Sequence, residues 1–122
     1  MSLANEWRKI LGETYPAKNP YHVDSADAER LAWADEMIAK LPAHLQDAAK
    51  KGGTGFYLGD FRFHEWTPGK CDFYPTRDEL KGGALKLFDF CLDEGLHLYI
   101  SAENEHGLRW VPPFSAFIHL KR

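Results

Sequence analysis

The sequence predicts an α+β fold in which N-terminal helices precede a mainly antiparallel sheet of four to five strands. Three observations predict it. Apolar residues recur with the period of a helix before Gly52, they alternate with the period of a strand from Gly55 onward, and a Thr-x-x-Glu capping box at Thr76 interrupts the strand-like part. We therefore expect one helix inserted between strands 2 and 3. The chain has 122 residues, which suits a single domain over 1–122.

Helical spacing of apolar residues predicts two amphipathic helices in the N-terminal third. A short one is expected over 3–12, from the spacing of Leu3, Trp7, Ile10 and Leu11. A longer one begins near Asp24 or Ser25, whose side chains can accept from the free amides of a helix start. Its apolar face is formed by Leu31, Trp33, Ala34, Met37, Ile38 and Leu41. Pro42 is expected to interrupt it and to leave a separate helical segment over 43–50.

Alternating residues predict the strands. The first is expected over 56–66 and forms a hairpin with a shorter strand over 71–74. The capping box of Thr76 and Glu79 then begins a helix, and Gly95 stands where a left-handed C-terminal cap belongs. The remaining strands are expected at the end of the chain, over 96–102, 108–111 and 114–120.

Period-two alternation gives the sheet two unlike faces. One face is apolar and forms the core, with Tyr57, Phe61, Phe63, Leu96, Leu98, Ile100, Ala102, Phe114, Ala116, Ile118 and Leu120. The other face is polar and aromatic, with Asp60, Arg62, His64, Trp66, His97, Tyr99, Ser101, Ser115, Phe117 and His119. We expect any function to lie on this second face.

The composition excludes some classes of partner. With 15 Lys plus Arg against 18 Asp plus Glu, the net charge of −3 is far from the basic excess of nucleic-acid-binding proteins. No stretch is apolar and long enough for a membrane span, so neither nucleic acid nor membrane is expected as a partner. Cys71 and Cys91 are too few for a disulfide framework, and Cys91 lies on an apolar helix stripe, as a free buried thiol does. We expect a cytoplasmic protein.

The histidines of the second face supply the residue types of acid–base catalysis. His64, His97 and His119 titrate near neutrality, and Arg62 could stabilise a developing anion. Asp60 or Tyr99 could orient a histidine. The competing interpretation is that these are the solvent-facing residues of a half-buried sheet. Motifs with metal-ligand spacing are absent, and neither a metal nor another cofactor is expected.

Aromatic residues favour binding as the function. Trp66, Tyr74 and Phe117 make the second face aromatic, and His106, Arg109 and Trp110 lie in a predicted loop over 103–113. Small accessory, inhibitor or immunity-like proteins have this size and lack catalytic motifs. We therefore expect a protein partner, or a second copy in a homodimer. Two alternatives stay open: a small hydrolase or transferase that uses His64 and His119, and a face covered by the chain's own N-terminal helices.

Overall fold

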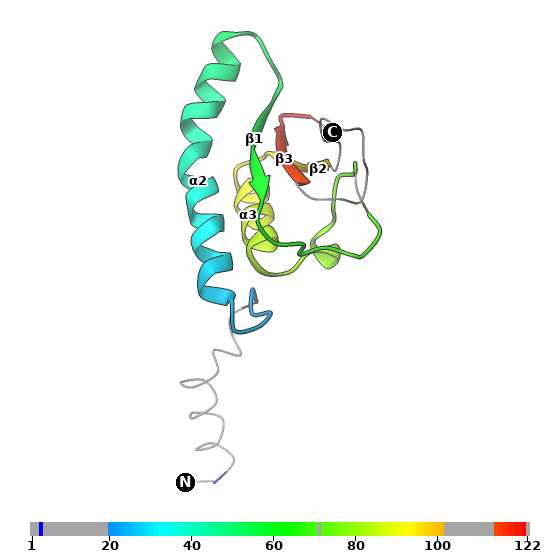
Figure 1. Ribbon diagram of the computed structural model, residues 1–122. Helices are drawn as coiled ribbons and strands as arrows, with labels where there is room; N and C mark the ends of the chain where they lie inside the picture. The colour runs from blue at the N-terminus through cyan, green and yellow to red at the C-terminus, as the bar shows by residue number, and fades with distance from the viewer. Residues whose placement is uncertain (1–2, 4–19, 71, 102–113, 122) are drawn as a thin grey trace.

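In the part of the chain that the structure describes, two α-helices and a sheet form two layers (Figure 1). The computed structural model describes residues 3, 20–70, 72–101 and 114–121. Helices α2 (Asp27–Lys50) and α3 (Gly82–Asp93) pack against each other, α2 also contacts the first strand, and α3 contacts the second. The helices therefore cover one face of the sheet, and the predicted α+β class is confirmed. The short helix expected over 3–12 lies outside the described residues apart from Leu3.

Within the described residues, the sheet has three antiparallel strands. β3 (Phe114–His119) lies in the middle, between β1 (Gly55–Phe61) and β2 (His97–Ser101). For the described residues, the prediction of four to five strands is wrong. The placement of the inserted helix between strands 2 and 3 is also wrong, because α3 lies between β1 and β2 along the chain. The strand expected over 108–111 lies outside the described residues.

The predicted hairpin between 56–66 and 71–74 does not form. β1 ends at Phe61, and the backbone beyond it pairs with the segment before α3, where Lys81 N donates to Glu65 O at 2.9 Å. Backbone groups bonded there cannot also pair with 71–74. Within that segment, Phe73 forms an isolated antiparallel bridge to β2 instead.

Helix α2 continues through Pro42, so the predicted break and the separate segment over 43–50 are wrong. Proline leaves one backbone carbonyl without its helical hydrogen bond, and Pro42 itself is exposed. The opposite side of the helix is buried in the core through Trp33, Met37 and Leu41. Burial of each such side chain is worth about 1.5–3 kcal/mol, so their packing exceeds the cost of about 3 kcal/mol for a helical proline.

The capping box of Thr76 and Glu79 is present, but it opens a 3-10 helix, Arg77–Glu79. Leu80 follows with extended backbone (φ −115°, ψ 157°), and α3 begins only at Gly82. The side chain of Leu80 is buried. This extended residue separates the capped turn from the helix that the box was expected to begin.

Most of the predicted core is confirmed, with six sheet residues buried: Phe61, Leu98, Ile100, Phe114, Ala116 and Ile118. Cys91 is also buried, and burial raises the pKa of its thiol to about 12. Two residues expected in the core are exposed instead, Tyr57 at 45% and Leu120 at 54%. Leu120 lies beyond the end of β3, and a bulge in β1 turns Tyr57 to the other face.

Candidate functional site

The sheet face opposite the helices carries a row of aromatic rings. We call it the aromatic face and define it by Tyr57, Tyr74, Tyr99, Phe117 and His119. Phe117 is the register partner of Tyr57 in β1 and of Tyr99 in β2, so three rings cross three neighbouring strands. The Phe117 centroid lies 5.6 Å from that of Tyr57 and 6.4 Å from that of Tyr99. These are the separations of interacting aromatic pairs.

His119 is held at one end of the aromatic face. The Tyr74 hydroxyl oxygen lies 2.5 Å from His119 Nδ1, and the imidazole stacks on Tyr99 at an angle of 17°. Gly55 is its partner in β1, and a Cβ at Gly55 would lie only 2.5 Å from His119 Cδ2. The ring therefore uses space that only glycine leaves. When Tyr74 donates to Nδ1, the proton of the neutral imidazole is on Nε2.

A shallow hollow of about 340 Å³ lies beside His119, whose Nε2 would be 3.3 Å from a Cβ at Gly55. Its wall is formed by Thr54, Gly55, Phe56, Tyr57, Phe117, His119 and Lys121. His97 is the partner of His119 in β2 and lies on the same face, half-buried. Two of the three predicted histidines are thus neighbours across adjacent strands.

Asp60 lies at the opposite end of the face and is already bonded. Its Oδ1 accepts from the Tyr57 hydroxyl at 2.6 Å and from the Ser115 hydroxyl at 3.1 Å. Partial desolvation, together with the neighbouring carboxylate, raises the pKa of Tyr57 to about 12. Tyr57 therefore stays a neutral phenol at physiological pH. Asp60 orients this tyrosine, whereas Tyr99 is the residue that contacts a histidine.

His64 is not part of the aromatic face. It follows the end of β1, stacks on Phe114 with ring centroids 5.4 Å apart, and meets Trp66 edge-on at 4.4 Å. Phe114 is the first residue of β3 and His119 is the last. Phe114, on which His64 stacks, therefore lies roughly 16 Å from His119 along the strand. Partial desolvation against these rings lowers the pKa of His64, an otherwise exposed residue, and the charge of Lys81 lowers it further. The structure does not bring His64 and His119 together.

Trp66 was expected on the polar face, but it is buried at 3% exposure. Because β1 ends at Phe61, the alternation does not continue to Trp66, which packs edge-on against Phe61 and donates from Nε1 to the Lys70 carbonyl at 2.9 Å. Arg62, directly after β1, is exposed and also lies outside the strand. The loop candidates lie outside the described residues: His106, Arg109 and Trp110.

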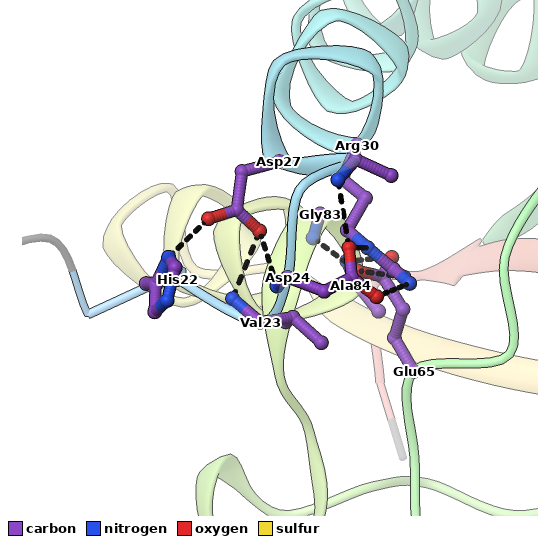
Figure 2. A network of polar contacts seen from close by, with 9 residues as sticks. His22, Val23, Asp24, Asp27, Arg30, Glu65, Gly83 and Ala84 are labelled. Atoms are coloured by element: carbon purple, nitrogen blue, oxygen red, sulfur yellow. Dashed lines mark hydrogen bonds and ion pairs between the residues drawn. The ribbon is translucent and has the colours of Figure 1, made fainter.

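A buried carboxylate that sequence reasoning missed joins both helices (Figure 2). Glu65 is fully buried, and it accepts from Gly83 N at 2.7 Å and from Ala84 N at 3.0 Å. Arg30 Nη1 of α2 lies 3.1 Å from Glu65 Oε2. Burial raises the pKa of Glu65, while the two amides and Arg30 oppose that rise. With donors on both oxygens, this carboxylate is an anchor of the fold and offers little to a ligand.

The Gly82-Gly83 pair was the sequence signal for this anchor. Glycines at a helix start leave room for a close neighbour, and the structure shows such close packing. Gly82 has φ +60°, and a Cβ there would lie 1.6 Å from Glu65 Oε2. The spacing in the sequence gave no indication that the partner is Glu65.

Residues that could hold a metal do not gather: within the described ranges, no three His, Cys, Asp or Glu side chains form such a group. None of the described helices has the length and apolarity needed to cross a membrane. Comparison of the chain with family models, curated proteins and solved structures found no match. The aromatic face, identified by its geometry alone, is therefore the candidate site.

Proposed function

We propose that the chain is a protein-binding domain whose aromatic face receives the partner. The observation that carries the proposal is a continuous row of rings on the face opposite α2 and α3, with Tyr57 45% exposed. Interfaces are enriched in aromatic residues and depleted in lysine. The composition of this face follows that pattern.

The contacts among the rings also support binding. Tyr74, Tyr99 and His119 touch one another, with centroids 4.9–5.5 Å apart. Side chains already held in place lose little conformational freedom when a partner binds, and that loss otherwise weakens association. Asp60 and Ser115 add a polar margin at the end of the row.

The hydrolase or transferase alternative has weaker support. General acid–base catalysis needs two groups within reach of one reacting atom. His64 contacts the start of β3 and His119 lies at its end, so the proposed pair would need a large rearrangement. We therefore keep binding as the one proposed function.

Site-specific photo-crosslinking tests this proposal. A photo-reactive phenylalanine analogue replaces Tyr57 on the aromatic face or, as a control, Ala39 on the exposed side of α2. We expect a discrete crosslinked protein in cells that express the first variant and none from the control. Absence of a product from position 57, or the same product from both positions, would contradict the proposal.

Sedimentation of the purified chain shows whether the partner is a second copy. If it is, the crosslinked product has twice the mass of the chain, and the sedimentation coefficient rises with concentration. Replacement of Phe117 by Ala should then return the chain to a monomer. A monomer at high concentration directs the search to another protein.

A further inference from the structure

One end of the aromatic face presents hydrogen-bond donors. Side chains of Phe117, His119 and Lys121 alternate to the same side along β3 and its continuation, and all three line the hollow next to Tyr57. Lys121 is exposed. Thr54 lines the same wall.

Lys121 brings a positive charge to this wall. Among the described residues Lys121 takes part in no ion pair, and the wall of the hollow contains no carboxylate. Asp60 pairs with Ser115 of β3, four residues before His119, and is bonded there to two hydroxyls. The aromatic face thus has a donor end at His119 and an acceptor end at Asp60.

His119 contributes to the donor end through one nitrogen. Nδ1 is engaged by Tyr74, so Nε2, beside Gly55, is the nitrogen that remains for a ligand. A carboxylate accepts hydrogen bonds only, so the His119 imidazole and the Lys121 ammonium of this wall suit it as donors.

We propose that this hollow binds an acidic side chain of the partner protein, with an aromatic neighbour of that side chain packed on Tyr57 and Phe117. The inference rests on the proposed function and specifies the partner's chemistry: an acidic residue adjacent to an aromatic one. Charge complementarity carries it, since Lys121, which forms no ion pair with any described residue, and the His119 imidazole line a hollow whose wall contains no acid.

The probes that test it are two capped dipeptides, acetyl-Trp-Glu-amide and acetyl-Trp-Gln-amide, followed by NMR chemical shifts at pH 7.5. We expect the Glu probe to shift the signals of His119 and Lys121 and to bind about two- to fivefold more tightly than the Gln probe, as for an exposed ion pair. Lys121→Met should remove this difference. Lys81→Met, which removes an equal charge from an exposed position before α3, should preserve it.

The outcomes separate the inference from the proposed function. Equal binding of both probes, or an advantage for Glu that survives Lys121→Met, overturns the carboxylate site while it leaves a binding face. No shift with either probe also overturns it, and the crosslinking from position 57 then decides the proposed function by itself. A Glu advantage lost in Lys121→Met supports the inference even where no crosslinked protein is found.

Discussion

At the residue scale, Tyr57 shows how one extra residue changes a face. A β-bulge between Tyr57 and Gly59 puts Leu58 in the core and leaves Tyr57 on the aromatic face. Strict alternation from residue 56 cannot reveal this shift, because every residue after a bulge changes sides. The sign of a bulge in the sequence was Gly59, because a glycine inside a strand often marks one. In the structure, a Cβ at Gly59 would lie 2.8 Å from the Met37 sulfur. Tyr99, Phe117 and His119 lie in strands without a bulge between them, so simple alternation predicted the correct face for all three.

Replacement of Gly82 tests the buried anchor. Gly82→Ala should lower the free energy of unfolding by at least ~3 kcal/mol, because its Cβ would displace the buried Glu65 carboxylate from its partners. Gly52 is the matched control, since its φ is +74° but a Cβ added there would have no other atom within 4 Å. Gly52→Ala should cost only about 1–2 kcal/mol for the left-handed backbone. Urea unfolding measures both, and equal losses would contradict the steric role of Glu65.

His64 should make stability depend on pH. Partial desolvation and Lys81 lower its pKa in the folded chain, so the unfolded state takes up this proton more readily. The contribution of His64 to stability should therefore fall as the pH drops below about 6.5, the ordinary pKa of histidine. His64→Phe keeps a ring on Phe114 but cannot titrate. Its unfolding free energy should decrease less than that of the wild type between pH 8 and 5.5, and an NMR pKa of His64 at or above 6.5 would contradict this.

At the element scale, local signals located the starts and ends of elements better than they identified their connections. Gly95 has φ +74° after the end of α3, as the sequence indicated. At the start of α2 the N-cap is Ala26, without a side-chain cap, although Asp24 two residues before it accepts from Ala26 N at 2.8 Å. The break at Pro42 and the helix start at Thr76 were wrong because tertiary packing determined both. Propensity describes one segment, whereas α2 is held by the sheet that it covers.

The substitution Pro42→Ala measures how much stability the chain loses by having a proline inside α2. We expect the free energy of unfolding to rise by about 1–3 kcal/mol, because alanine restores one helical hydrogen bond. The unfolded chain also becomes less constrained without the proline, which offsets part of this gain. Pro68 is the control: it is exposed in a turn closed by Lys70 N donating to Thr67 O. Pro68→Ala should lose about 0.4–1 kcal/mol. Thermal unfolding compares the two, and a loss of stability in Pro42→Ala would show that the proline contributes a required contact.

At the scale of the whole molecule, the strand order could not be predicted, because pairing depends on contacts between distant segments. β1 pairs with the last strand and not with the segment that follows it, so the sequential hairpin was the wrong choice. The two edges of the sheet are modified in different ways. The bulge interrupts β1, and Phe73 bridges the outer side of β2. Such features discourage edge-to-edge pairing, which favours the aromatic face over a sheet edge as the binding surface.

Two adjacent residues of β3 distinguish the roles of the two faces. Ile118 is 1% exposed on the helix side, whereas Phe117 lies on the aromatic face and is only half-buried. Ile118→Ala should lose about 2–5 kcal/mol of stability through the cavity it leaves. Phe117→Ala should lose about 1–2 kcal/mol, since its ring is partly solvated, yet it should abolish crosslinking from position 57. Urea unfolding and crosslinking on the same variants provide both measurements. If Phe117→Ala destabilises the chain as much as Ile118→Ala does, the aromatic face is a second core covered within the folded protein, and the binding proposal is wrong.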